Sequence, residues 1–481
     1  MHRKYSPPYP DAPGKILGNT QKTPFICSSI IRTEVNAMTP VYHLPAHVLR
    51  DEIAKGRLTS EELTKIYLNR IDAVGARVNA IAEIDETALD QARALDADES
   101  KRSLPLFGLP VLIKDNIDVK GLHTTAGSVA LKDHIAQTDA PVAGRLREMG
   151  AVILGKTNMT EFANYMTDDL PNGFSSRGGQ VVNAYSPEHN PGGSSTGSAV
   201  AVSAGLCAFA IGTDTCFSIV GCAAQNGVTG YKPAGGMLPG KGIIPICFAL
   251  DMPGPLTRDV WDAHMVYAAL RTAPVAPLAP TPAGDIKLAV NVFEKENVSK
   301  EQLARYEALF DALRKEGGQV TEIHQSSASV VRRNVMRYAF KHDLEAYLHA
   351  SGAPVKTLAD IIAYYNEEPE TRAPYGVTVL QMAQDVATGN LDEPEYHEAL
   401  KEQKALKARI IKEIKDFDAC LMTGHTDVMH TVNLPSITIN LSMAEDGTPR
   451  GAILYGADET RLLNAAAALE KIVPGVVPPT I

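Results

Sequence analysis

The spacing of apolar residues predicts alternating helices and strands over most of this chain. Leu63, Ile66 and Tyr67 recur at helical spacing, so they would share one face of a helix. Thr59, three residues before Glu62, is typical of the residue that caps the start of such a helix. We therefore expect an amphipathic helix that begins at this point.

Short apolar runs predict strands between further helices. The runs at 109–113 and 151–154 flank a segment of helical character at 140–149, and a similar unit begins at 286–290. Alternation of this kind is typical of layered α/β proteins. We therefore expect one large α/β domain over residues 41–481, with a central mixed β-sheet flanked by helices.

The N-terminal part of the chain carries weaker signals. Residues 76–100 are rich in alanine and acidic residues, so we expect them to continue the preceding helix. Residues 1–40 are irregular and contain proline, which indicates an N-terminal extension of the domain. They lack a positively charged start followed by a continuous apolar core, so we expect no signal peptide and a cytoplasmic location. The most apolar stretch, 199–211, is too short to span a membrane.

Composition narrows the possible partners. The chain is 44% hydrophobic and 21% charged, which is ordinary for a globular protein. Its net charge of −10 argues against a general nucleic-acid surface. The six cysteines include no close pair, so we expect reduced thiols and neither a zinc site nor a disulfide framework. We expect no nucleic-acid or membrane partner.

Two serines and a lysine carry the candidate chemistry. Ser194 and Ser218 each lie in a stretch that contains glycine, which lets the backbone pass close to a substrate. Lys114 follows an apolar run of strand type, where a lysine can be buried. Serine is a poor nucleophile until a base takes its proton, and a lysine can be that base only when burial keeps it neutral. These residue types indicate a nucleophilic site.

These segments, in this order, resemble the amidase signature family from about Leu44 to Glu470, and the likeness includes motifs at 124–128, 155–159, 227–233 and 254–258. Members of that family hydrolyse amides with a Ser–cis-Ser–Lys triad, and their nucleophile follows the cis-serine by 24 residues. Ser218 follows Ser194 by that interval. The resemblance implies that Ser218 is the nucleophile, that Ser194 relays its proton, and that Lys114 accepts it.

The chain departs from the family immediately before the proposed nucleophile. The resemblance implies an oxyanion hole made of four successive backbone N–H groups, those of Thr215, Cys216, Phe217 and Ser218. It also implies supporting roles for Asp214 and Ser195. The family normally has glycines at the positions of Cys216 and Phe217, and a non-glycine residue does not easily adopt positive φ. Three interpretations stay open: a reshaped acyl pocket, which we favour, a weakened enzyme, and a diverged or engineered variant.

Two further patterns are weaker. Residues 150–157 satisfy the GxxxxGKT pattern, but their apolar centre is itself strand-like and follows a helical segment, so we expect no nucleotide site. His425 and His430 are five residues apart on an irregular stretch, which is weak evidence for a metal, and we expect ordinary loop histidines. We expect neither a metal nor an organic cofactor.

The remaining choice is between kinds of amidase. Residues 358–366 and 374–376 resemble peptide-amidase-like members, and Val220 stands where the A-type chains of amidotransferases usually have arginine. This favours a stand-alone hydrolase of small-molecule carboxylic amides, carbamates or esters, acting on linear carbon–nitrogen bonds rather than on peptide backbone in general. An amidotransferase A-type subunit with a partner chain and a non-catalytic binding protein on the same fold stay open. The identity of the substrate and the formation of a homodimer also stay open.

Overall fold

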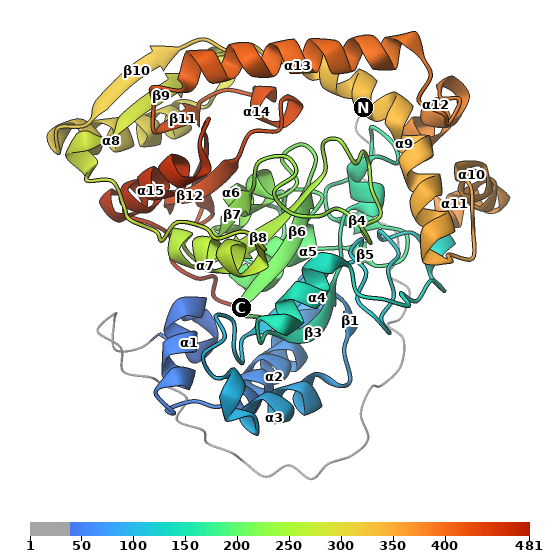
Figure 1. The fold of residues 1–481 in the computed structure, drawn as a ribbon, viewed down its shortest axis with the longest axis horizontal. Coiled ribbons are helices and arrows are strands. Elements are labelled where there is room, and N and C mark those ends of the chain that lie inside the picture. Colours follow the sequence, from blue (N-terminus) through green and yellow to red (C-terminus); the bar gives the residue numbers. More distant parts are fainter. Residues whose placement is uncertain (1–38) are drawn as a thin grey trace. The chain divides into compact units, whose positions relative to one another are not determined.

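An eleven-stranded mixed sheet runs through the part of the chain that the computed structural model describes, residues 39–481 (Figure 1). The strand order is β1-β3-β2-β6-β8-β7-β12-β13-β11-β9-β10. The strands are β1 (Ile81–Ile84), β2 (Pro110–Lys114), β3 (Val152–Thr157), β6 (Phe209–Asp214), β7 (Thr229–Lys232), β8 (Met252–Thr257), β9 (Lys287–Asn291), β10 (Gln319–Ile323), β11 (Ala419–Met422), β12 (Ser436–Met443) and β13 (Pro449–Tyr455). Two short strands, β4 (Phe174–Ser175) and β5 (Gly179–Gln180), pair separately.

Helices flank this sheet, which confirms the expected α/β architecture with a central mixed sheet (Figure 1). The helices are α1 (Ala46–Ala54), α2 (Ser60–Val78), α3 (Ala88–Asp96), α4 (Pro141–Glu148), α5 (Thr196–Ser203), α6 (Val220–Asn226), α7 (Val260–Leu270), α8 (Lys300–Lys315), α9 (Ser329–Ser351), α10 (Leu358–Glu367), α11 (Pro369–Arg372), α12 (Thr378–Val386), α13 (Pro394–Ile414), α14 (Val428–Thr431) and α15 (Glu459–Leu469). Residues 1–38 of the expected extension lie outside the described residues.

Local sequence signals explain several of these boundaries. The hydroxyl of Thr59 accepts the backbone N–H of Glu62, whose carboxylate accepts the N–H of Thr59, so the predicted cap of α2 is confirmed. The continuous helix expected over residues 76–100 is wrong. Asn79 ends α2 in the left-handed conformation, and the chain then forms β1, which pairs with β3. This pairing is tertiary, so local composition could not predict it.

The central strands bring distant segments to one edge of the sheet. Strand β2 lies between β3 and β6 and is parallel to both, and β6 is antiparallel to β8 on its other side. Lys114 ends β2 and Asp214 ends β6, so the two residues lie at the same edge. Helix α5 is buried along its whole length and runs into β6 through a short turn, as its small apolar residues predict.

Helices α9 to α13 form a largely helical region with a core of its own (Figure 1). Phe340 on α9 and Tyr365 on α10 belong to this core, which also includes Met159 and Phe162 from the segment after β3. Helix α9 packs against both α12 and α13. The helical region is therefore joined through apolar contacts to the loops at the carboxyl end of the central strands.

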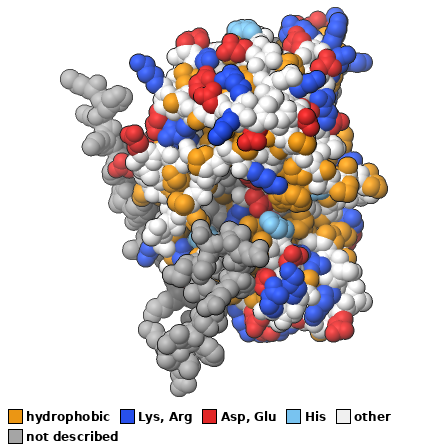
Figure 2. Space-filling view, turned by 90° about the vertical axis from the view of Figure 1, so that its left-hand side faces the viewer, with side chains coloured by type: hydrophobic (Ala, Val, Ile, Leu, Met, Phe, Trp, Pro, Cys, Tyr) orange, Lys and Arg blue, Asp and Glu red, His pale blue; other side chains and the backbone are white. Residues whose placement is uncertain are grey.

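The surface mixes charges of both signs. On the face shown in Figure 2, acidic and basic side chains are interspersed, and hydrophobic side chains gather toward its right-hand side. This mixture matches a composition of 46 Lys and Arg residues against 56 Asp and Glu residues. Among residues 39–481, none of the helices combines the length and the hydropathy that a membrane span requires.

Candidate active site

The three side chains singled out from the sequence form one hydrogen-bonded chain. Lys114 Nζ lies 2.8 Å from Ser194 Oγ, which in turn lies 3.0 Å from Ser218 Oγ. Lys114 and Ser194 are fully buried, and Ser218 is 5% exposed. The peptide bond between Gly193 and Ser194 is cis. The structure therefore brings the predicted nucleophile, relay and base into direct contact in that order.

Three elements hold these side chains in place. Lys114 is the last residue of β2, Ser194 lies in the loop just before α5, and Ser218 lies in the turn between β6 and α6. Ser195 joins the two serine loops, because its backbone N–H donates to the carbonyl oxygen of Ser218 at 3.1 Å. Its hydroxyl also donates to the carbonyl oxygen of Thr213 at 3.0 Å. The supporting position predicted for Ser195 thus corresponds to contacts on both sides of the site.

Lys114 is surrounded by hydroxyl groups rather than by carboxylates. Its Nζ lies 3.0 Å from Ser195 Oγ and 2.8 Å from Thr213 Oγ1, in addition to its contact with Ser194. Burial disfavours the charged ammonium and lowers the pKa of Lys114 to about 8, although Cys222, Asp214 and Asp251 at longer range raise it. Roughly a tenth of Lys114 is therefore neutral at pH 7, and this fraction rises toward pH 8.

Asp214 organises the turn that carries Ser218. Its Oδ2 accepts the N–H of Ile219 at 2.7 Å and that of Val220 at 3.2 Å, at the start of α6. Burial alone would raise the pKa of Asp214, but His430, Lys232 and the N–H of Ile219 hold this pKa at about 2. An ionised carboxylate therefore fixes the direction in which the chain leaves β6.

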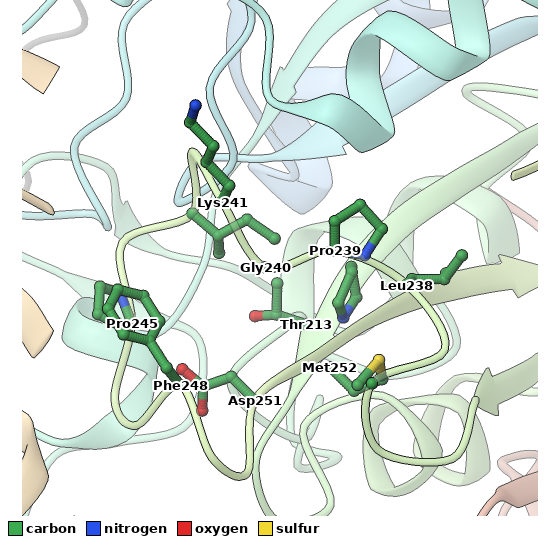
Figure 3. Close-up of a pocket in the computed structure, with 12 residues that line it drawn as sticks. Thr213, Leu238, Pro239, Gly240, Lys241, Pro245, Phe248, Asp251 and Met252 are labelled. Atoms are coloured by element: carbon green, nitrogen blue, oxygen red, sulfur yellow. The ribbon is translucent and has the colours of Figure 1, made fainter. Parts of the chain in front are cut away.

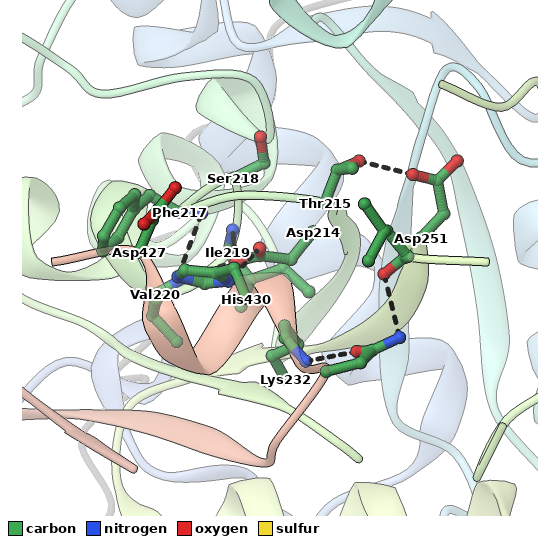
Figure 4. A network of polar contacts seen from close by, with 12 residues as sticks. Asp214, Thr215, Phe217, Ser218, Ile219, Val220, Lys232, Asp251, Asp427 and His430 are labelled. Atoms are coloured by element: carbon green, nitrogen blue, oxygen red, sulfur yellow. Dashed lines mark hydrogen bonds and ion pairs between the residues drawn. The ribbon is translucent and has the colours of Figure 1, made fainter. Parts of the chain in front are cut away.

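The segment 215–218 differs from the predicted oxyanion hole in one donor. The N–H of Phe217 donates to His430 Nε2 at 3.3 Å (Figure 4). Within residues 39–481, the N–H groups of Thr215, Cys216 and Ser218 have no hydrogen-bond acceptor. Phe217 adopts φ of 65°, the left-handed region that glycine would favour. Three of the four predicted donors are thus unpaired, and the fourth is engaged by an imidazole.

A second carboxylate anchors the same segment from its other end. The hydroxyl of Thr215 donates to Asp251 Oδ1 at 2.5 Å, and Asp251 Oδ2 accepts the N–H groups of Ile246 and Cys247 at 2.8 and 3.0 Å. Burial raises the pKa of Asp251 to about 6. Asp251 therefore ties the nucleophile's loop to the loop that precedes β8.

A cavity of about 510 Å³ lies beside these groups (Figure 3). Thr213, which contacts Lys114, and Asp251, which contacts Thr215, both contribute to its wall. Much of the remaining lining is apolar and comes from Leu238, Pro239, Ile243, Pro245, Phe248 and Met252. Lys241 and Asp251 are the ionisable residues of this mainly apolar wall, so the cavity suits a largely apolar group next to the candidate chemistry.

The ring of Phe217 lies elsewhere. Its centroid is 4.3 Å from that of His430 and 5.1 Å from that of His425, and Phe217 is not among the described residues that line the cavity. The expectation of ordinary loop histidines is confirmed for the position of His425 and is wrong for His430, which lies on a helix. His430 is fully buried on α14 under the nucleophile's loop, whereas His425 lies just before that helix.

Sequence reasoning missed Thr213, Asn116, Asp251 and the contacts of His430. Asn116 Nδ2 donates to Thr213 Oγ1 at 3.1 Å and to the carbonyl oxygen of Ile244 at 3.2 Å, so it braces the hydroxyl beside Lys114. Asn116 directly follows the Lys114–Asp115 pair, and that position was the available signal. The others lie far along the chain from the residues they touch.

The GxxxxGKT run has no phosphate-loop geometry. Strand β3 covers Val152–Thr157, so Lys156 lies inside a strand rather than in a loop before a helix. Lys156 Nζ is fully buried and lies 3.6 Å from Asp115 Oδ1. The expectation that the apolar centre of this run is itself a strand is confirmed.

Comparison with known proteins gives consistent results. The family model described as Amidase matches residues 62–435. The chain is 34% identical over 449 residues to a probable amidase of Arabidopsis thaliana, covering 86% of this chain and 87% of the relative. It is 31% identical to the native peptide amidase of Stenotrophomonas maltophilia, with a TM-score of 0.84 and coverage of 91% and 98%. It is also 31% identical over 490 residues to the A chain of the glutamyl-tRNA(Gln) amidotransferase of Roseiflexus castenholzii, covering 90% and 97%.

Proposed function

The chain belongs to the amidase family, and from that premise we propose that it hydrolyses a linear carboxylic amide through a covalent acyl-serine intermediate. The observation that carries this proposal is the unbroken chain from Lys114 Nζ through Ser194 Oγ to Ser218 Oγ, with steps of 2.8 and 3.0 Å. Hydrogen-bond distances of this length allow a proton to move along the chain. The protein is thus an amidase for which we assign the reacting groups.

The first half of the reaction forms the acyl-enzyme. Ser218 Oγ attacks the carbonyl carbon of the amide while its proton passes to Ser194, and the Ser194 proton passes to neutral Lys114. Collapse of the tetrahedral intermediate breaks the carbon–nitrogen bond. The leaving nitrogen takes back a proton from Lys114 through Ser194. Ser218 is then esterified, and Lys114 is neutral again.

The second half reverses the relay with water as the nucleophile. Water attacks the ester carbon, its proton moves through Ser194 to Lys114, and Ser218 Oγ leaves and recovers that proton. Both tetrahedral intermediates carry an oxyanion. We assign its stabilisation to the unpaired N–H groups of Thr215, Cys216 and Ser218, because backbone donors fixed before the reaction need no reorganisation. No step requires a metal ion or an organic cofactor.

The lining of the cavity supports a proposal about one part of the substrate. We propose that an apolar part of the substrate occupies the 510 Å³ space beside Thr213, since Leu238, Phe248 and Met252 line it. Similarity to a peptide amidase makes small peptide amides one class to test, beside aryl amides, carbamates and esters. The partner is a small molecule in each case.

Similarity to the A chain of an amidotransferase supports a second candidate, a protein that acts only with partner chains. We favour a stand-alone hydrolase because Val220 presents no cationic side chain at the start of α6. Hydrolysis of a simple amide by the purified chain decides between the two. Turnover without any partner supports the hydrolase, and turnover that appears only when partner chains are added supports the amidotransferase.

A third candidate, a non-catalytic binding protein, is separated by covalent labelling. A fluorophosphonate reacts with an activated serine and not with an ordinary one. We expect one equivalent of the fluorophosphonate to attach to the native chain and none to attach after denaturation. Absence of labelling in the folded chain, together with absence of turnover, would support the binding protein.

We further propose a cytoplasmic location. Five cysteines of the described residues are free thiols, and free thiols persist in reducing compartments. They are Cys207, Cys216, Cys222, Cys247 and Cys420. Cell fractionation tests this location. A sedimentation measurement on the purified chain decides between a monomer and a homodimer.

A further inference from the structure

His430 lies directly under the loop that carries Ser218. Its ring is fully buried on α14, and its Nε2 accepts the backbone N–H of Phe217 at 3.3 Å (Figure 4). The same ring meets the Phe217 ring edge-on, with centroids 4.3 Å apart. His430 thus contacts both the backbone and the side chain of the residue before the nucleophile.

The other nitrogen of His430 faces a carboxylate. Nδ1 lies 3.2 Å from Asp214 Oδ1, which is a close ion-pair distance, and among residues 39–481 neither atom makes a hydrogen bond of good geometry. Because Nε2 accepts an N–H, it carries no proton, and the imidazole proton must lie on Nδ1 toward Asp214. Asp214 therefore selects the tautomer in which Nε2 is an acceptor.

Asp214 also fixes the opposite end of the same loop. Its Oδ2 accepts the N–H groups of Ile219 and Val220, so the carboxylate holds the residues that follow Ser218. His430 holds the residue that precedes Ser218. Asp214 therefore holds the residues after Ser218 directly, and it acts on the residue before Ser218 through His430.

We infer that His430 is a positioning residue, which orients the oxyanion-binding loop by accepting the Phe217 N–H in the tautomer that Asp214 selects. This inference rests on the proposed function, because it assigns a task to the loop in that reaction. The peptide unit that carries the Phe217 N–H lies between the unit that carries the Cys216 N–H and the unit that carries the Ser218 N–H. Fixing the Phe217 unit limits the directions in which those two donors can point.

The conformation of Phe217 supports this role. A phenylalanine at φ of 65° is strained relative to glycine, so surrounding contacts must hold it there. His430 supplies both a hydrogen bond to its backbone and an edge-on ring contact, whereas the exposed His425 contacts its ring alone. Phe217 thus stands where the family normally has glycine, and His430 contacts both its backbone N–H and its ring.

Charged groups from several elements surround the imidazole. Asp214 approaches from β6, Lys232 from β7, and Arg332 from α9, where Arg332 Nε lies 2.8 Å from Asp427 Oδ2. Burial, with Lys232 and Arg332, lowers the pKa of His430, and Asp214 opposes this effect. Neutral His430 therefore persists at and below neutral pH. Protonation in acid would place a hydrogen on Nε2. Nε2 could then no longer accept the Phe217 N–H, and this hydrogen bond would be lost.

Two substitutions separate positioning from packing. His430→Leu removes the acceptor but keeps an apolar side chain, whereas His430→Gln can place an amide oxygen near the position of Nε2. His425→Leu is the matched control, because His425 contacts the Phe217 ring without a hydrogen bond to the loop. Circular dichroism and thermal unfolding identify variants that remain folded.

We expect His430→Leu to lower kcat on the order of tenfold to a hundredfold with KM changed by less than about threefold, since a misplaced oxyanion donor affects the transition state. A trifluoromethyl ketone, which forms a tetrahedral adduct, should bind more weakly by a similar factor, whereas an unreactive amide inhibitor should not. His430→Gln should recover most of kcat, and His425→Leu should stay within about threefold of wild type. Near-normal kcat in folded His430→Leu, or equal weakening of both inhibitors, would overturn the inference.

Imidazole ¹⁵N NMR of the wild type provides a measurement that does not depend on folding of a variant. The His430 signals, identified by their absence in His430→Gln, should report Nδ1–H and an unprotonated Nε2 at neutral pH. An Nε2–H tautomer would overturn the inference. If the wild type hydrolyses no amide, the proposed function fails, but the tautomer still shows whether His430 accepts the Phe217 N–H.

Discussion

Lys114 and Ser194 meet at 2.8 Å in the protein interior, and both side chains are fully buried. Water therefore does not separate the proposed base from the proposed relay. Burial also lowers the pKa of Lys114 to about 8, which makes the lysine a usable proton acceptor. The contact thus explains how a residue that is normally charged could activate Ser218 through an intervening hydroxyl.

Removing the side chain of Lys114 or of Ser194 should lower kcat severely, and the losses in kcat should not add in the double variant. We expect Lys114→Ala and Ser194→Ala each to lower kcat by roughly 10³-fold or more, because the relay acts as a unit. The double variant should lose little beyond the worse single variant. Steady-state kinetics of all three proteins make the measurement. Losses that multiply in the double variant would show that the two residues act independently.

The pH profile should report Lys114. Only the neutral lysine accepts a proton, so kcat/KM should rise about tenfold per pH unit below about 8 and level off above it. Lys114→Arg should be nearly inactive at every pH, because a guanidinium stays charged. The measurement is kcat/KM between pH 5 and pH 10. A flat profile, or a near-normal rate in Lys114→Arg, is incompatible with a lysine base.

Phe217 does not line the 510 Å³ cavity, so an influence of its ring on which acyl groups are accepted would come from other space beside Ser218. Its partly exposed ring lies one residue before Ser218, and in Phe217→Gly the loop would lose this ring while gaining freedom at a positive φ. We expect the ranking of amides by acyl bulk to change, together with a loss of overall rate. The measurement is kcat/KM for a series of increasing acyl size. Identical rankings in both proteins would mean that the ring packs against the two histidines and does not affect the choice of acyl group.

Glu161 should make stability depend on pH. It is fully buried, and its carboxyl contacts the hydroxyl of Tyr365 on α10 and that of Ser176. Burial raises the pKa of Glu161 from 4.5 to about 7. The folded state thus binds more protons than the unfolded state between these values, so Glu161 makes stability fall as pH rises through this window. At about 1.4 kcal/mol per pKa unit, the shift corresponds to about 3 kcal/mol.

Glu161→Gln tests this assignment, because glutamine keeps the shape of a neutral carboxyl without a titrating proton. The decrease in unfolding free energy between pH 5 and pH 8 should become smaller in the variant. Urea unfolding at each pH provides the free energies. An unchanged slope would show that other groups cause the dependence.

The sequence allowed prediction of the residues that lie inside recognisable local motifs. Lys114, Ser194 and Ser218 each lie in such a segment, and their order along the chain matches the order in which they make contact. Asp251 and His430 could not be predicted in this way. Asp251 lies just before β8 and His430 lies on α14, and each meets the segment after β6 only in the folded chain, while their neighbours in sequence have ordinary composition.

The fold was predictable to a similar extent. Strand β2, whose last residue is Lys114, is a short apolar run that the sequence indicates directly. Strand β1 was not predictable, because it exists through its pairing with β3 rather than through its own residues. The positive φ of Phe217 was also not predictable, since phenylalanine rarely adopts it and the ring contact with His430 on α14 joins residues far apart in the sequence.

Replacement of Ser218 by alanine tests the central claim most directly. The proposed mechanism has one nucleophile, so Ser218→Ala should reduce kcat/KM by on the order of 10⁴-fold or more while the thermal unfolding temperature stays close to that of wild type. Amide hydrolysis by wild type and Ser218→Ala, prepared in parallel, makes the comparison. Hydrolysis by folded Ser218→Ala within tenfold of wild type would contradict the assignment of Ser218 as the nucleophile.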